Sequence, residues 1–103
     1  MWIFLNNSFL SIVENRNNKE QLLIRSRIKG DIERVFPNSD VFEMSNSDYK
    51  YRSYIKKIEV SKKLMTLVKN INYDNFKSSI SPDEIDRHNS YLKVWSEVRK
   101  LQK

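Results

Sequence analysis

The chain lacks cysteine altogether and carries only one glycine, Gly30, and one histidine, His88, among its 103 residues. Without cysteine it has no disulfide, no thiolate nucleophile, no iron–sulfur cluster and no Cys-type zinc site. A single glycine excludes the glycine-rich loops that bring the backbone close to phosphate. A lone histidine does not supply the three protein ligands of a zinc site, and it reads more simply as a helix surface residue than as a general base. We therefore predict a protein that is not an enzyme and that holds no cofactor or metal.

Long hydrophobic runs are also absent, so the sequence predicts no membrane span and no membrane partner. The first residues, MWIFLNN, have neither the positive segment nor the small-residue cleavage site of a signal peptide. The lack of cysteine fits a reducing compartment, and we expect a cytoplasmic protein. The chain is long enough for one core, to which twelve aromatic residues contribute. This indicates one compact domain over residues 1–103.

Positive charge is distributed unevenly along the chain. Residues 1–50 carry seven Lys/Arg and seven Asp/Glu, whereas residues 51–103 carry twelve and six, so the second half accounts for the whole net charge of +6. A basic surface attracts phosphates, anionic lipid or acidic protein faces. The asymmetry therefore predicts an anionic partner without identifying it.

An apolar hairpin is predicted at the start of the chain. Trp2–Leu5 and Ser8–Glu14 flank Asn6-Asn7 at the two-residue spacing of a tight turn, where asparagine can adopt the positive φ that glycine usually provides. Both faces of the hairpin are apolar, which is typical of a central place in a sheet that is covered on both sides. As an edge strand, Trp2–Leu5 would instead be able to pair with a second copy of the chain.

Further elements follow from the periodicity of apolar residues. Leu22–Ile28 predicts a strand with Ile24 on one face and Arg25 on the other, and Lys29–Phe36 predicts a short helix that ends before proline. Residues 38–50 form a polar connection. Tyr51–Ile58 predicts a fourth strand with a bulge near Lys56-Lys57.

Two helices are predicted in the rest of the chain. Ser61 is the expected N-cap of the first, whose buried stripe is Leu64, Leu67, Val68 and Ile71. Ser81-Pro82 opens the last, whose apolar face is Tyr91, Val94, Trp95, Val98 and Leu101. The order β-β-β-α-β-α-α predicts an α+β fold, in which C-terminal helices pack on a four-stranded, mainly antiparallel sheet.

Several segments resemble a family of small uncharacterised bacterial and phage proteins that begin with Met-Trp and an apolar hairpin. The matching residues are Met1-Trp2, Phe9-Leu10-Ser11-Ile12-Val13, Ile24-Arg25-Ser26-Arg27-Ile28, Asp48-Tyr49-Lys50-Tyr51-Arg52, Tyr73-Asp74-Asn75-Phe76-Lys77, and Tyr91 with Val94-Trp95. The segment YDNFK and the later Y-x-x-V-W spacing are the most specific parts. Where the family has a proline between two tyrosines, this chain has Lys50. The resemblance implies a single compact domain and supplies no chemistry.

Arginines on neighbouring strands form the first candidate site. Arg25 and Arg27 share a strand face, Arg52 lies on the next strand, and Tyr54 in phase with it offers a stacking surface. Three guanidiniums on one face suit phosphate or carboxylate. The alternative, which we favour, is that they form structural links with Asp31, Asp48 or Asp74.

Lysines form the second candidate site: Lys56, Lys57, Lys62 and Lys63 surround a strand end and the start of a helix. An anion bound there would relieve their repulsion from the positive end of the helix dipole. The more common explanation is a solvated surface that protects an edge strand. The YDNFK segment, Tyr73 to Lys77, is expected to be a structural connector in which Asp74 or Asn75 caps a short helix.

The function expected from these features is a non-enzymatic binding module whose basic face contacts nucleic acid or a nucleoprotein complex. No helix-turn-helix, zinc finger or RNP motif indicates sequence-specific readout. The alternative is a protein-binding inhibitor or adaptor, such as a phage-encoded inhibitor of a host defence complex, which an exposed apolar patch would favour. An enzyme is the least expected, since it would need a carboxylate or tyrosine mechanism, for example one in which Asp31, Asp48 and Asp74 meet as metal ligands.

Overall fold

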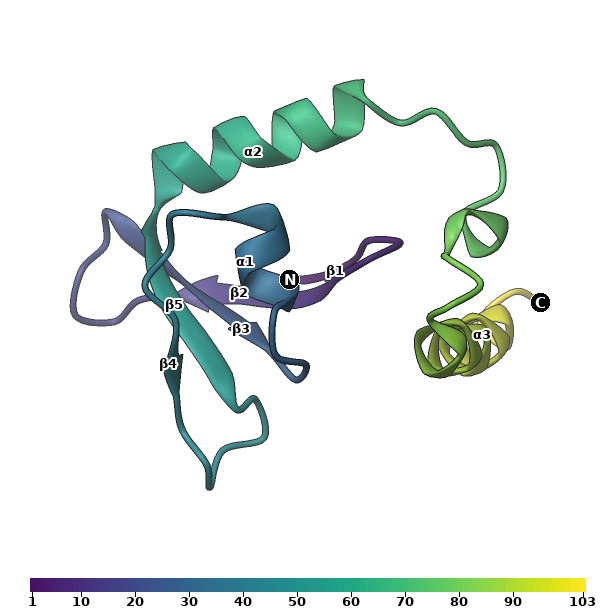
Figure 1. Cartoon of the computed structure of the whole chain (residues 1–103), viewed down its shortest axis with the longest axis horizontal. Coiled ribbons are helices and arrows are strands. Elements are labelled where there is room, and N and C mark those ends of the chain that lie inside the picture. Colours follow the sequence, from purple (N-terminus) through teal and green to yellow (C-terminus); the bar gives the residue numbers. More distant parts are fainter. The chain divides into compact units, whose positions relative to one another are not determined.

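The chain divides into two units in the computed structural model, which describes every residue from Met1 to Lys103. Unit 1, Met1–Ile71, contains a five-stranded antiparallel sheet and two helices, whereas unit 2, Asn72–Lys103, is helical. Figure 1 shows β1–β5, α1 and α2 in unit 1 and α3 in unit 2. The predicted α+β class is thereby confirmed, while the extent of one domain over residues 1–103 stays a prediction.

The sheet of unit 1 has the order β1-β2-β3-β5-β4, and every neighbouring pair is antiparallel. The strands are β1 (Trp2–Phe4), β2 (Phe9–Glu14), β3 (Gln21–Ser26), β4 (Phe42–Glu43) and β5 (Tyr51–Lys56). The predicted four-stranded sheet is wrong, because β4 adds a fifth strand within the polar connection. The predicted central place of the hairpin is also wrong for β1, which is an edge strand. Since β4 has only two residues, it gives no alternating pattern to read.

Alternation along the strands separates a core face from an outer face. Leu10, Ile12, Ile24 and Ile55 of the sheet form the core with Ile32, Val35 and Phe36 around α1 (Asp31–Val35) and with Val60 of α2 (Lys57–Lys69). Both helices of unit 1 therefore pack on the same face. Because successive side chains of a strand point to opposite sides, Arg25, Arg52 and Tyr54 belong to the outer face.

The hairpin turn has the predicted length but a different backbone. Phe4 pairs with Phe9, and the Leu5 amide donates to the Ser8 carbonyl at 2.8 Å. No residue other than Gly30 has a positive φ, so Asn6 and Asn7 do not adopt the positive φ that was predicted for the turn. At Gly30 a φ of 97° precedes α1, which starts at Asp31 and not at the predicted Lys29.

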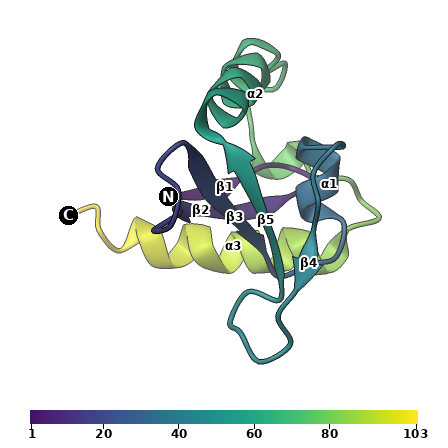
Figure 2. The same ribbon diagram turned by 90° about the vertical axis from the view of Figure 1, so that its left-hand side faces the viewer.

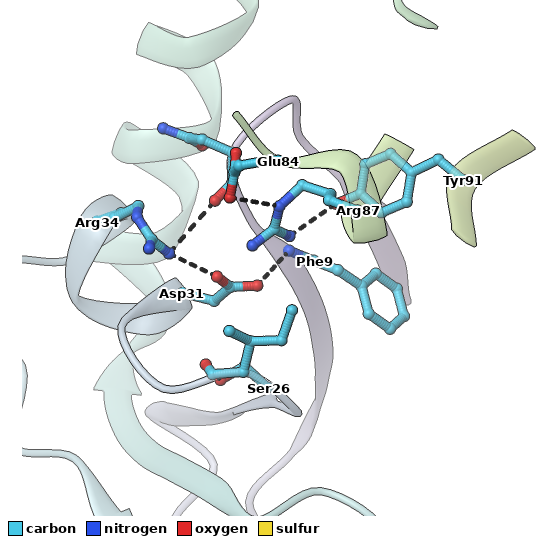
Figure 3. A network of polar contacts seen from close by, with 9 residues as sticks. Phe9, Ser26, Asp31, Arg34, Glu84, Arg87 and Tyr91 are labelled. Carbon is cyan, nitrogen blue, oxygen red and sulfur yellow. Dashed lines mark hydrogen bonds and ion pairs between the residues drawn. The ribbon is translucent and has the colours of Figure 1, made fainter. Parts of the chain in front are cut away.

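Asp31 ties α1 to the start of β2 within unit 1. Its carboxylate is fully buried and accepts hydrogen bonds from the Phe9 amide at 2.9 Å and from Arg34 at 2.6 Å, as Figure 3 shows. A buried carboxylate is costly unless such donors surround it. The contact joins residues 22 positions apart and so fixes the short helix against the hairpin.

The strand β5 continues into α2 without a loop (Figure 2). The Lys57 amide donates to the Glu20 carbonyl at 2.8 Å, so the helix begins at Lys57 at the end of the sheet. The predicted bulge at Lys56-Lys57 is therefore wrong. Ser61 is not an N-cap either, because it lies inside the helix and its hydroxyl donates to the Lys57 carbonyl at 2.8 Å.

The buried stripe of α2 lies one turn earlier than predicted. Val60 is in the core, and Leu64 and Leu67 pack against it. Val68 and Ile71, predicted to be buried, are exposed. The earlier start of the helix brings Val60 into phase with Leu64 and Leu67 at four- and seven-residue spacing.

Unit 2 contains a short 3₁₀ helix, η1 (Lys77–Ser79), and the long helix α3 (Ile85–Arg99). The Asn75 side chain accepts from the Ser78 amide at 3.1 Å, which confirms it as a capping residue. The predicted start at Ser81-Pro82 is wrong, since residues 81–84 form a turn in which the Glu84 amide donates to the Ser81 carbonyl at 2.9 Å.

The side chains of unit 2 stack along one another. Phe76 lies parallel to Tyr91 with ring centroids 5.9 Å apart, and Tyr73 lies 5.9 Å from Phe76. Arg87 donates to Glu84 at 3.0 Å and to the Tyr91 hydroxyl at 3.1 Å (Figure 3). The rest of the predicted apolar face of α3 remains exposed: Val94, Trp95, Val98 and Leu101. Neither α2 nor α3 combines the length and the apolar composition that a transmembrane helix requires.

Replacing Asp31 tests the link between α1 and the hairpin. We expect Asp31→Ala to lower the free energy of unfolding by about 1–3 kcal/mol, because the Phe9 amide and Arg34 lose their buried acceptor. Urea denaturation measures this difference. The matched control is Glu33→Ala in the same helix, whose side chain is exposed. Equal stability of the two variants would show that the Asp31 contact does not stabilise the fold.

Candidate binding surface

Two of the three predicted arginines lie over one buried ring, that of Tyr49, and the third, Arg52, bonds to the backbone of the same residue. The guanidinium carbons of Arg25 and Arg27 lie 4.6 Å and 4.7 Å from the centroid of this ring, within the range of cation–π attraction. Arg25 and Arg52 stand opposite each other on β3 and β5. We call these four residues, Arg25, Arg27, Tyr49 and Arg52, the Tyr49 clamp.

Hydrogen bonds engage two of the three guanidiniums within the chain. Arg52 donates to the Tyr49 carbonyl at 3.1 Å and to the Ser47 hydroxyl, and it lies 3.6 Å from the Asp48 carboxylate. Arg25 donates to the Ser11 hydroxyl at 2.7 Å. Asp48 is thus confirmed as one of the expected carboxylate partners. The clamp ties the turn before β5 to the outer face of the sheet, and only Arg27 of the three arginines is exposed.

Sequence reasoning missed Tyr49 as the centre of this cluster. Only 3% of its surface is exposed, although it lies in a segment predicted as a polar connection. The single local signal was an aromatic residue two positions before the predicted strand Tyr51–Ile58, and this does not show that arginines more than twenty positions away cover it.

Half of the eight predicted site residues line one groove of unit 1. Tyr54, Lys56, Lys62 and Lys63 surround it with the residues that follow α1, and its volume is about 530 Å³. Glu59 and Asp40 also line it. Lys57 lies outside the groove, beside a second depression of about 510 Å³ that Lys56 also lines. The structure therefore separates the lysines from the Tyr49 clamp.

The lysines differ from Arg52, which pairs with Asp48, in having no carboxylate partner. We call Lys56, Lys57, Lys62 and Lys63 the lysine surface; no ion pair joins any of them to Asp or Glu. Residues 51–69 carry six Lys/Arg and one Asp/Glu, a net of +5. Unit 1 as a whole carries thirteen and eight, which is also +5. The excess positive charge of unit 1 therefore lies on β5 and α2.

Two exposed rings lie beside each other at the β4 edge of the sheet. Phe42 and Tyr54 are 37% and 48% exposed, and their ring centroids are 5.6 Å apart. We call them the ring pair. Phe42 stands opposite Arg52 on the neighbouring strand, so the ring pair shares the outer face with Arg52 and Lys56.

The remaining candidates have structural partners. Lys77 of the YDNFK segment lies 4.0 Å from the ring centroid of Trp95, and Asn75 caps η1. His88 is half-buried in α3, where its amide donates to the Glu84 carbonyl at 3.0 Å. No three Asp, Glu or His side chains gather in a way that could hold a metal ion.

No protein-family model, no curated protein and no solved structure matches this sequence. The resemblance to small bacterial and phage proteins therefore stays a prediction, and the surface has to be interpreted from its own chemistry.

The contacts of the Tyr49 clamp indicate that loss of the Tyr49 ring strongly lowers the stability of the fold. We expect Tyr49→Ala to lower the free energy of unfolding by about 3–5 kcal/mol, as for other buried aromatic residues. Tyr49→Phe should change it little, because the hydroxyl donates no hydrogen bond within the chain. The control Tyr54→Ala removes an exposed ring and should cost less than about 1 kcal/mol, the span of strand propensities. If urea denaturation gave Tyr49→Ala the stability of Tyr54→Ala, the clamp would not be a stabilising contact.

Proposed function

We propose that this chain is a non-enzymatic binding module that binds nucleic acid, alone or within a nucleoprotein complex, through the lysine surface. The observation that carries the proposal is the contrast between lysines and arginines: the four lysines have no ion-pair partner, whereas Arg25 and Arg52 are bonded within the chain. Cations at the surface that have no carboxylate within ion-pair distance keep most of their attraction for phosphate.

The proposal shifts the contact away from part of the predicted site. Arg25 and Arg52 hold Tyr49 and the turn before β5, so they act as positioning residues for the outer face. Arg27 is exposed and directly follows β3, where it can add to the basic surface. Binding through lysine to phosphate is independent of sequence, since phosphate contacts carry no base information.

A protein partner is the second candidate function, favoured by one observation on α2. Ile58, Met65 and Val68 are 58%, 54% and 66% exposed, and their spacing of seven and three residues places them on one flank of the helix. An exposed apolar strip of this kind is typical of a protein interface. It supports the inhibitor or adaptor alternative, including a phage-encoded inhibitor of a host defence complex.

Neutralising three lysines of the groove tests the proposed function. We expect Lys56→Gln/Lys62→Gln/Lys63→Gln to weaken binding to labelled DNA and RNA oligonucleotides at low salt. If each lysine contacts one phosphate, the slope of log K against log salt should fall by about 2 for single strands. Titrations by fluorescence anisotropy at several salt concentrations measure both quantities.

The control variant is Lys19→Gln/Lys93→Gln/Lys103→Gln, which removes the same charge from exposed positions outside the lysine surface. It should bind nearly as the parent does. An equal loss in both variants would mean that only net charge matters, and no binding by the parent at low salt would overturn the proposal. Copurification of a protein that contacts the chain through Ile58, Met65 and Val68 would then support the second candidate function, that of a protein-binding inhibitor or adaptor.

A further inference from the structure

The ring pair offers a feature that the lysine surface alone does not explain. Phe42 and Tyr54 expose their rings on the outer face of the sheet, away from the core face on which α1 and α2 pack. A ligand that covers exposed aromatic rings is favoured, because it removes apolar surface from water. Tyr54 also lines the lysine groove together with Lys56, Lys62 and Lys63, so this ring connects the groove to Phe42, which lies beside it.

We propose that the ring pair is a stacking platform for an unpaired base, and that the ligand of this surface is a single-stranded nucleic acid. The inference rests on the proposed function, because the lysine surface supplies the charge that holds the phosphate backbone. A sheet face with exposed rings and flanking cations suits a single strand, since each unpaired base has a free face that a ring can cover.

The geometry favours a single strand over a duplex. Bases of a duplex are stacked on one another, and their faces are not accessible to a protein ring without base flipping. Lys56 stands two residues beyond Tyr54 on the same strand face, about 7 Å further along β5, so a base on Tyr54 and a phosphate on Lys56 can belong to neighbouring parts of one strand. The positive charge of the lysines therefore favours a nucleic acid as the ligand, and the exposed rings favour a single strand over a duplex.

Stacking does not need the Tyr54 hydroxyl, which makes the role of the ring testable. The Tyr54 hydroxyl takes part in no hydrogen bond within the chain. Tyr54→Phe should therefore bind a single strand as the parent does, whereas Tyr54→Ala and Phe42→Ala should not. A surface that only attracts phosphate would respond to none of the three changes.

The experiment compares a labelled oligothymidine and a duplex of equal length. We expect the affinity of Tyr54→Ala for the single strand to fall about 5- to 150-fold, the range that stacking of one base supplies, with little change for the duplex. The matched control is Trp95→Ala, which removes a ring that is also 48% exposed and also lies near cations, Lys77 and Arg99. This variant should bind as the parent does.

Photo-crosslinking gives a readout that does not depend on a stable variant. Irradiation of the parent with a bromouracil-substituted single strand should crosslink the segments that contain Phe42 and Tyr54. Crosslinks confined to other segments, or unchanged single-strand affinity of Tyr54→Ala, would overturn the inference. If Lys56→Gln/Lys62→Gln/Lys63→Gln binds the single strand weakly while Tyr54→Ala binds it as the parent does, base stacking on the ring pair is wrong and the proposed function stands. If the parent binds neither oligonucleotide, both fail.

Discussion

The register between β3 and β5 is the constraint on which the rest of unit 1 depends. In this register Ile24 stands opposite Ser53 and Arg25 stands opposite Arg52. Because side chains alternate along a strand, a slip of one residue would move Ile24 out of the core and put Arg25 into it. The same alignment places Tyr54 on the outer face. Core, clamp and ring pair are therefore three consequences of one strand pairing.

Lysine and arginine have different roles in this unit, and their chemistry explains the difference. The planar guanidiniums of Arg25 and Arg27 lie against Tyr49, and Arg52 uses several donors at once on the turn before β5. Lysine is a compact, strongly hydrated charge on a flexible stem, which suits solvent and phosphate better than a planar stack. In unit 1 the three predicted arginines thus make contacts within the fold, whereas the four lysines have no ion-pair partner.

Local patterns in the sequence correctly predicted features that depend on neighbouring residues in the chain, such as strand alternation and the capping of η1. The opposite placement of Ile24 and Arg25 follows from strand alternation, and Asn75 caps η1 through its own side chain, as predicted. Ser61 has the chemistry of an N-cap, but the helix starts earlier because the Lys57 amide finds an acceptor at Glu20, far back in the chain. Tertiary contacts of this kind override a local preference and leave no periodic signal.

The candidate site was predictable in composition but not in arrangement. The eight residues are basic or aromatic, as the charge asymmetry indicates, yet the sequence does not show that Tyr49 collects the arginines or that Phe42 stands beside Tyr54. Phe42 belongs to a strand of two residues, which the bond from the Met44 amide to the Lys50 carbonyl at 2.8 Å closes.

The Tyr49 clamp and the ring pair are coupled through Arg52. On one side Arg52 stands opposite Phe42 across the β4–β5 pair, and on the other its guanidinium holds the turn that joins these two strands. The turn has to stay in place for a two-residue strand to remain paired, because so few ladder bonds hold β4. Arg52, predicted to bind the ligand directly, therefore has a structural role: it fixes the turn next to the strand that carries Phe42 and so helps to keep the two rings side by side.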